Sequence, residues 1–235
     1  MINEMLMFAR GPLFVFCSTL MVLGIIRLVV ILVINIHGSI KNAGCSDITY
    51  RDTVRETAIW MLPLRRLFNT SPVFSTVSFL FHVGVIVVPL FLLEHVLLLE
   101  NGTGIRLWNI PGNVADTLTG MVLITGCILL LYRIMKRSGR GISSFSHYFI
   151  LVIILTVFAS GYVAASPYNP ISYTGMMLCH VLAGNLLLVL IPFSRLSHAI
   201  VYPFIRLVTL SGWCFPYGGG KKANNKIFGS EQIEI

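Results

Sequence analysis

The sequence predicts an all-α membrane protein with five transmembrane helices, and three observations lead to that fold class. Of its 235 residues, 56% are hydrophobic and 11% are charged, whereas about 25% of the residues of an ordinary soluble domain are charged. The apolar residues gather in five blocks, and about 20 apolar residues suffice for a helix to cross a bilayer. The cations stand in the short segments between these blocks. This distribution is typical of a multi-pass membrane protein, so we do not expect nucleic acid as a partner.

Each apolar block is bounded by a turn-rich or charged segment. The first block is too long for a cleaved signal peptide and no small-residue cleavage site follows it, so we expect it to remain as a membrane span. The stretch "AIVYPFIRLVTL" after the last block is expected to extend that helix or to lie in the interface. The mixed apolar and basic "RETAIWMLPLRRLFN" of the first loop predicts an amphipathic segment on the membrane surface. The expected spans are 12–36, 76–99, 114–134, 147–166 and 173–200.

The positions of Lys and Arg predict the orientation of the chain. The first loop, the third loop and the C-terminal part together hold fourteen of them, and the opposite side holds two, Arg10 and Arg106. Loops rich in Lys and Arg stay on the cytoplasmic side. We therefore expect the N-terminus outside and the C-terminus in the cytoplasm. The chain is expected to form one membrane domain over 1–210, followed by a cytoplasmic tail over 211–235.

The five cysteines predict no metal centre of their own. No two of them form a C-x-x-C pair. That spacing is typical of zinc sites and of c-type haem attachment, and it is also common among iron–sulfur ligands. We expect them to be small residues within helices and loops.

Four of the six histidines lie inside predicted spans, where polar side chains are costly and mark functional sites. His180 and His198 are 18 residues apart, which is five helical turns and returns both to one face about 27 Å apart. The second span runs antiparallel to the fifth, so His82 comes to the depth of His198 and His95 to that of His180. Two histidines facing each other at one depth can ligate a haem iron from both sides, so the pairs predict two haems stacked across the bilayer. The alternative is that each histidine bonds a neighbouring carbonyl or hydroxyl group and does no chemistry.

Cationic and small residues near the histidines suit such a site. Arg195 lies three residues before His198 and Arg27 lies within the first span, so both are candidate partners for anionic haem propionates. The alternative for each is an arginine that extends to the membrane interface. Gly84 and Gly184 would give a flat macrocycle room, or would let helices pack closely.

The spacing of the two histidines in the second span does not place them on one face of an ideal helix. His82 and His95 are 13 residues apart, which leaves them about 140° apart around an ideal helix. Pro89 lies between them and is expected to bend or locally rewind the span. The alternative is that the two haems flank different sides of this helix.

Several stretches resemble the gamma subunit family of respiratory nitrate reductase. These stretches are "FHVGVIVVPLFLLEHVLLL", "HVLAGNLLLVLIPFSRLSH", "FARGPLFVF" and "LWNIPGNVADTLT". They most closely resemble the relatives of that family in the transmembrane redox complexes of sulfate- and metal-reducing bacteria. The resemblance implies a five-helix b-type cytochrome with two haem b groups. Its ligands carry over onto His82 with His198 for the inner haem, and onto His95 with His180 for the outer haem. The 13-residue spacing is longer than in the nitrate reductase subunit, so that subunit's haem tilt and quinone pocket are not carried over.

The resemblance also implies a place in the bacterial inner membrane and a set of partners. Such cytochromes carry electrons between the quinone pool, with menaquinone as the candidate, or an exterior multihaem cytochrome c, and a cytoplasmic iron–sulfur protein related to heterodisulfide reductase. Other membrane subunits are expected in the complex. Bis-histidine ligation leaves no open iron position, so the chain is expected to be an electron-transfer subunit that is not catalytic alone, except at a quinone site.

Two other functions compete with this one. A haem-free membrane anchor or transporter subunit explains the spans and the charge bias equally well, and a cytochrome that bypasses quinone explains the histidines. Near the outer haem, Glu94, Glu100 and Asp116 are candidates for handling quinone protons, or are solvated acids at helix ends. His37 and His147 fall at the cytoplasmic ends of spans one and four, where interfacial histidines are usually solvated.

Overall fold

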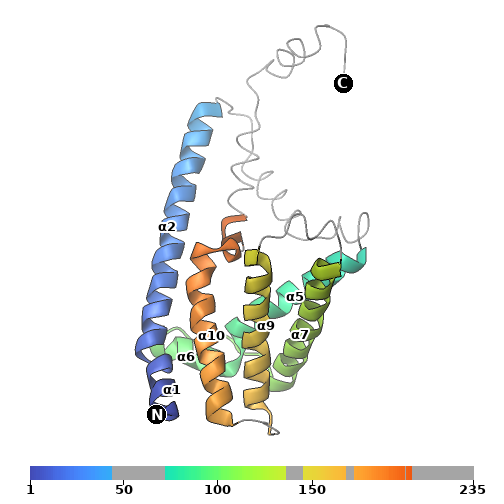
Figure 1. Cartoon of the computed structure of the whole chain (residues 1–235). Helices are drawn as coiled ribbons and strands as arrows, with labels where there is room; N and C mark the ends of the chain where they lie inside the picture. The colour runs from blue at the N-terminus through green and yellow to red at the C-terminus, as the bar shows by residue number, and fades with distance from the viewer. Residues whose placement is uncertain (44–71, 136–144, 168–171, 199, 203–235) are drawn as a thin grey trace. The chain divides into compact units, whose positions relative to one another are not determined.

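A computed structural model of the protein describes residues 1–43, 72–135, 145–167, 172–198 and 200–202 (Figure 1). These residues form helices and connecting turns, and no strand occurs among them. The elements are α1 (Ile2–Arg10), α2 (Pro12–Ala43), α5 (Pro72–Phe91), α6 (Leu93–Thr103), α7 (Gly112–Met135), α9 (Phe145–Ala165), α10 (Tyr173–Phe193) and the 3-10 turn η1 (Arg195–Ser197). The amphipathic segment predicted in the first loop and the tail over 211–235 lie outside the described residues.

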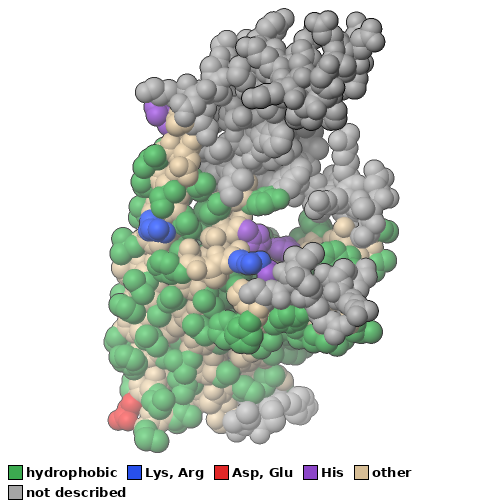
Figure 2. All heavy atoms as spheres, turned by 45° about the horizontal axis from the view of Figure 1, so that its top comes forward, with side chains coloured by type: hydrophobic (Ala, Val, Ile, Leu, Met, Phe, Trp, Pro, Cys, Tyr) green, Lys and Arg blue, Asp and Glu red, His purple; other side chains and the backbone are tan. Residues whose placement is uncertain are grey.

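Five helical stretches in this part of the chain are long and apolar enough to cross a membrane, which confirms the predicted all-α class with five candidate spans. Their apolar side chains are largely exposed, among them Ile124 in α7 at 65%. Figure 2 shows a surface on which hydrophobic side chains predominate and charged ones are sparse. An apolar surface of this extent suits a protein whose surroundings are lipid. The stretches are Ile2–Asn35, Pro72–Phe91, Gly112–Met135, Phe145–Ala165 and Tyr173–Phe193, and they indicate a multi-pass membrane protein.

The chain divides into two compact units. The first comprises Met1–Met21 and Pro63–Leu196, and the second comprises Val22–Leu62 and Ser197–Ile235. Within the first unit α5 packs on α7, α7 on α9, α9 on α10, and α10 on α1. In Figure 1, α7, α9 and α10 stand side by side while α5 and α6 run obliquely behind them. The buried core of this unit comes from α5, α7 and α9, and consists of Phe81, Val88, Val122, Leu129, Ile150, Leu151, Ile154 and Phe158.

The second predicted span divides into two helices. Pro89 has no N–H to donate to the carbonyl of Val85, so it weakens the last turn of α5. The helix ends at Phe91, and Leu92 is extended, with φ −66° and ψ 132°, before α6 begins. The backbone N–H of Ile110 donates to the Phe91 carbonyl at 2.9 Å, which stabilises the break. The bend predicted at Pro89 therefore takes the form of a complete interruption.

Glycine allows the closest helix contact in this unit. A Cβ atom added to Gly84 would lie 2.3 Å from Val122 Cγ2 and 3.2 Å from the Leu118 carbonyl oxygen. Gly84 is therefore a packing residue between α5 and α7, which is the second of the two roles considered for it. No atom lies within 4 Å of a Cβ added to Gly184.

Candidate functional site

The imidazole rings of His95 and His180 face each other in the first unit. His95 comes from α6 and His180 from α10, and their ring centroids lie 6.1 Å apart with an interplanar angle of 13°. Both side chains are partly buried. The structure thus brings together the pair predicted from equal depth on antiparallel spans. Because the helix is interrupted at Leu92, the angle of about 140° expected between His82 and His95 on an ideal helix does not apply.

Backbone carbonyl groups orient three of the four predicted ligands. Nδ1 of His180 lies 2.9 Å from the Val157 carbonyl oxygen, and Nδ1 of His95 lies 3.2 Å from that of Pro89. His82 makes the same contact within its own helix, 2.6 Å from the Ser78 carbonyl oxygen. A carbonyl oxygen only accepts, so Nδ1 carries the hydrogen in each ring and donates it. Nε2 then carries the lone pair, which is the arrangement typical of metal-ligating histidine.

The break in the second span supplies one of these carbonyl groups. In a continuous helix the Pro89 carbonyl would accept from the N–H of residue 93. Because Leu92 is extended, that oxygen is open to the side chain of His95 instead. Pro89 and His95 thus belong to one local arrangement, in which the helix break orients the imidazole.

The spacing of the two rings suits a metal between them. Two metal–nitrogen bonds of about 2.0 Å, together with the radius of each imidazole ring, separate the ring centres by about 6 Å. The observed separation is 6.1 Å with nearly parallel planes. The distance is compatible with a haem iron ligated from both sides and also with an offset stack of the two rings in direct contact, for which centroid separations of about 4.5–7 Å are usual. No group of three or more His, Cys, Asp or Glu side chains that would hold a free metal ion occurs among the described residues.

The inner pair stays a prediction. His82 is exposed on α5 in the first unit, and His198 is exposed directly after η1 in the second. Arg27 is exposed on α2, also in the second unit. The positions of the two units relative to one another are not determined, so the structure does not test this pair.

Arg195 contacts the start of α9. Its guanidinium donates to Nε2 of His147, so that nitrogen is the acceptor. The backbone carbonyl of His147 accepts from Arg133 at 3.3 Å, and Tyr148 donates back to the Arg133 carbonyl at 3.3 Å. These contacts link the ends of α7, α9 and η1. His147, which was expected to be solvated, is a member of this cluster.

The acids predicted near the outer pair differ in their surroundings. Glu100 forms an ion pair with Arg106 at 3.7 Å. Glu94 and Asp116 are exposed. Glu94 directly precedes His95 in α6, so it is the acid nearest in sequence to the facing imidazoles.

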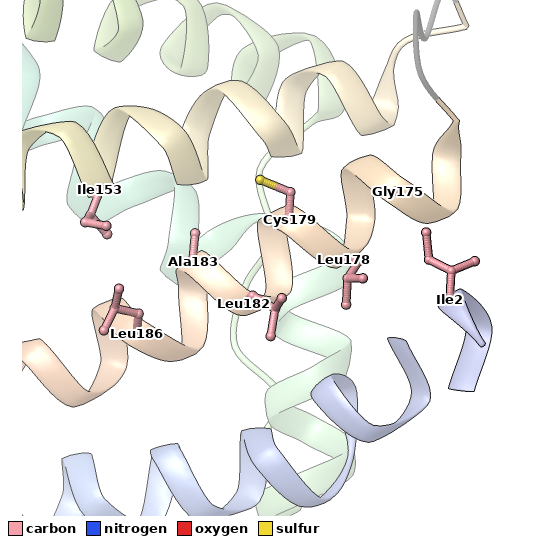
Figure 3. A pocket seen from close by; sticks show the side chains of 8 residues that line it. All are labelled: Ile2, Ile153, Gly175, Leu178, Cys179, Leu182, Ala183 and Leu186. Carbon is pink, nitrogen blue, oxygen red and sulfur yellow. The ribbon is translucent and has the colours of Figure 1, made fainter. Parts of the chain in front are cut away.

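An apolar groove of about 510 Å³ runs along α10 (Figure 3). It begins at Ile2 of α1 and reaches Ile153 of α9, and most of its lining comes from α10. Cys179, the neighbour of His180 in the chain, is one of the lining residues. The groove therefore opens on the same turn of α10 that carries the facing imidazole.

A comparison with known proteins finds a relative of this chain. A protein of Nitratidesulfovibrio vulgaris (strain Hildenborough), whose recorded name is only "Protein", is 33% identical over 150 residues. The match covers 63% of this chain and 66% of that protein, so the chain spans somewhat less than two thirds of its relative's length. No protein-family model matches the chain. No solved structure matches it either.

Sequence reasoning did not anticipate Val157, whose carbonyl accepts from His180, or Gly161, against which that imidazole packs. Every residue has a carbonyl group, so Val157 carries no signal of its own. Gly161 stands in the sequence "FASGY", and a glycine within a membrane helix indicates close packing but not its partner.

Proposed function

We propose that this chain is a dihaem b-type cytochrome subunit, similar to the gamma subunit family of respiratory nitrate reductase. It carries electrons between the quinone pool, or an exterior multihaem cytochrome c, and a cytoplasmic iron–sulfur protein related to heterodisulfide reductase. Haem iron, when bound, supplies one-electron redox chemistry without an open site for substrate. The chain is thus an electron-transfer subunit of a larger oxidoreductase.

The observation that carries the proposal is the facing pair of His95 and His180. Their separation of 6.1 Å and their interplanar angle of 13° suit two axial ligands. Carbonyl groups on α5 and α9 hold both Nδ1 hydrogens, so both Nε2 atoms keep their lone pairs for the metal. A haem-free anchor would gain nothing from two polar rings placed opposite each other at one depth of the membrane.

The orientation and the membrane belong to the same proposal. Fourteen Lys and Arg residues lie on one side and two on the other, which favours a cytoplasmic C-terminus in the bacterial inner membrane. His82 and His198 then ligate the inner haem, and Arg195 and Arg27 neutralise propionates. The facing pair belongs to the outer haem, and the groove along α10 suits the apolar tail of a quinone such as menaquinone.

Haem counting with single and double histidine variants tests the proposal. A pyridine haemochrome assay of the purified chain is expected to give two b haems per polypeptide, and one in each of His82→Ala, His95→Ala, His180→Ala and His198→Ala. Partners in one pair share a haem, so His95→Ala with His180→Ala retains one haem, whereas His82→Ala with His180→Ala retains none. His37→Ala, an exposed histidine at the end of α2, serves as the control and retains both.

Other results would favour the competing functions. A chain without b haem would be an anchor or a transporter subunit. Two haems that quinol fails to reduce in isolated membranes, with no effect of quinone-site inhibitors, would indicate a cytochrome that exchanges electrons directly with an exterior protein.

A further inference from the structure

Gly161 of α9 lies directly against the imidazole of His180. A Cβ atom added to it would lie 2.9 Å from Cε1 and 2.9 Å from Nδ1 of that ring. Such separations are shorter than van der Waals contact. Any side chain at position 161 therefore requires the imidazole to move.

The same glycine opens the path to the carbonyl that orients the ring. Val157 stands four residues before Gly161 in α9, so both lie on one face of the helix. The Val157 carbonyl accepts from the N–H of Gly161 within the helix and also from Nδ1 of His180 at 2.9 Å. A methyl group at position 161 would occupy the space through which the imidazole reaches this oxygen.

We infer that Gly161 is a positioning residue for the outer haem, holding the His180 imidazole in its ligating orientation by leaving room over the Val157 carbonyl. This inference rests on the proposed haem-binding function. Gly161 is not proposed as a ligand of the metal. It acts through His180, whose Nδ1–H bond sets both the direction and the basicity of Nε2.

Two other glycines show that this contact is particular to position 161. A Cβ added to Gly126 of α7 would meet apolar side chains, Leu155 at 2.6 Å and Phe81 at 3.0 Å. One added to Gly120, also on α7, would meet nothing within 4 Å. Gly126→Ala is thus a matched packing clash away from the imidazole, and Gly120→Ala is a matched change in open space.

The test compares Gly161→Ala, Gly126→Ala and Gly120→Ala in the purified full-length chain. The readouts are haem content, the midpoint potential of each haem, the low-spin EPR signals and the thermal unfolding temperature. Gly161→Ala is expected to fold, since the clash is with a side chain that can rotate. One haem of its two should be lost or should change its potential and EPR signal, while the other stays as in the wild type. Gly120→Ala should match the wild type, and Gly126→Ala should lower the unfolding temperature with both EPR signals unchanged.

Three results would overturn the inference. The first is a Gly161→Ala chain with both haems and with unaltered potentials and EPR signals. The second is the same haem loss in Gly126→Ala, and the third is failure of Gly161→Ala to fold where Gly126→Ala folds, since both indicate packing alone. A wild-type chain without b haem would instead refute the proposed function, so the two failures are distinguishable.

Discussion

The side-chain amide of Asn185 donates a hydrogen bond to the backbone carbonyl of Ala9, at 2.9 Å and 176 residues away in the chain. Both residues are buried, at 3% and 1% exposure. Ala9 is in the last turn of α1, where carbonyl groups lack helical donors, and a membrane interior offers no water to replace them. The Asn185 amide thus fixes α1 on α10 at the site where it also satisfies an otherwise unpaired carbonyl.

Replacing Asn185 should loosen this junction. Asn185→Leu leaves the Ala9 carbonyl buried without a donor, which costs about 1–3 kcal/mol, so the free energy of unfolding in detergent should fall by that amount. Asn101→Leu, an exposed asparagine near the end of α6, is the control and should change stability little. Equal stability of the two variants would show that the Asn185 bond contributes nothing to holding α1.

The position of His95 opposite His180 depends on the register of α6. One alanine inserted between Leu93 and Glu94 turns His95 by about 100° around the helix and should remove one of the two haems, as measured by pyridine haemochrome. The same insertion between Leu98 and Leu99 lies after His95 and should leave both haems in place. Loss of one haem from both variants, or from neither, would contradict the role of the α6 register.

The five candidate spans and the proximity of His95 to His180 could be predicted from the sequence, because hydrophobicity and depth are properties of one-dimensional spacing. The match in depth between His95 and His180 follows from antiparallel helices alone. Their angular match does not, because it depends on where the helix breaks after Pro89. The break comes three residues later at Leu92, where the loop residue Ile110 bonds to the Phe91 carbonyl.

Contacts made by backbone atoms could not be predicted from the sequence either, because they too depend on the tertiary structure. The carbonyl groups of Val157 and Ala9 differ from other carbonyl groups only through the tertiary structure around them. Gly84 and Gly161 are both glycines in apolar helices, yet one packs against α7 and the other against an imidazole. The sequence pattern indicates that such glycines matter and leaves their partners open.

The contact of Gly84 with α7 predicts a partial rescue. Gly84→Ala places a methyl group 2.3 Å from Val122 Cγ2, and overpacking of this kind costs about 1–3 kcal/mol. Val122→Ala also destabilises, because Val122 is fully buried. The double variant should lose less stability than the two single losses combined, since the smaller side chain accommodates the new methyl. Additive losses in detergent unfolding would place the strain on the Leu118 backbone instead.

Arg195 is expected to act through its charge on the inner haem, for which we propose His82 and His198 as ligands. A positive charge stabilises the reduced form of a nearby haem, and a unit charge about 10 Å away contributes roughly 1–2 kcal/mol at an effective dielectric constant of about 20. Arg195→Gln should therefore lower one midpoint potential by tens of millivolts in a redox titration, and Arg195→Lys should restore most of it. Arg106→Gln is the control, because that guanidinium lies in the segment after α6, is exposed and pairs with Glu100 of α6.

Arg195 also contacts His147, so an effect of its charge has to be distinguished from a purely structural role. If Arg195→Lys and Arg195→Gln lower the unfolding temperature alike while both potentials stay as in the wild type, Arg195 serves only to join η1 to α9.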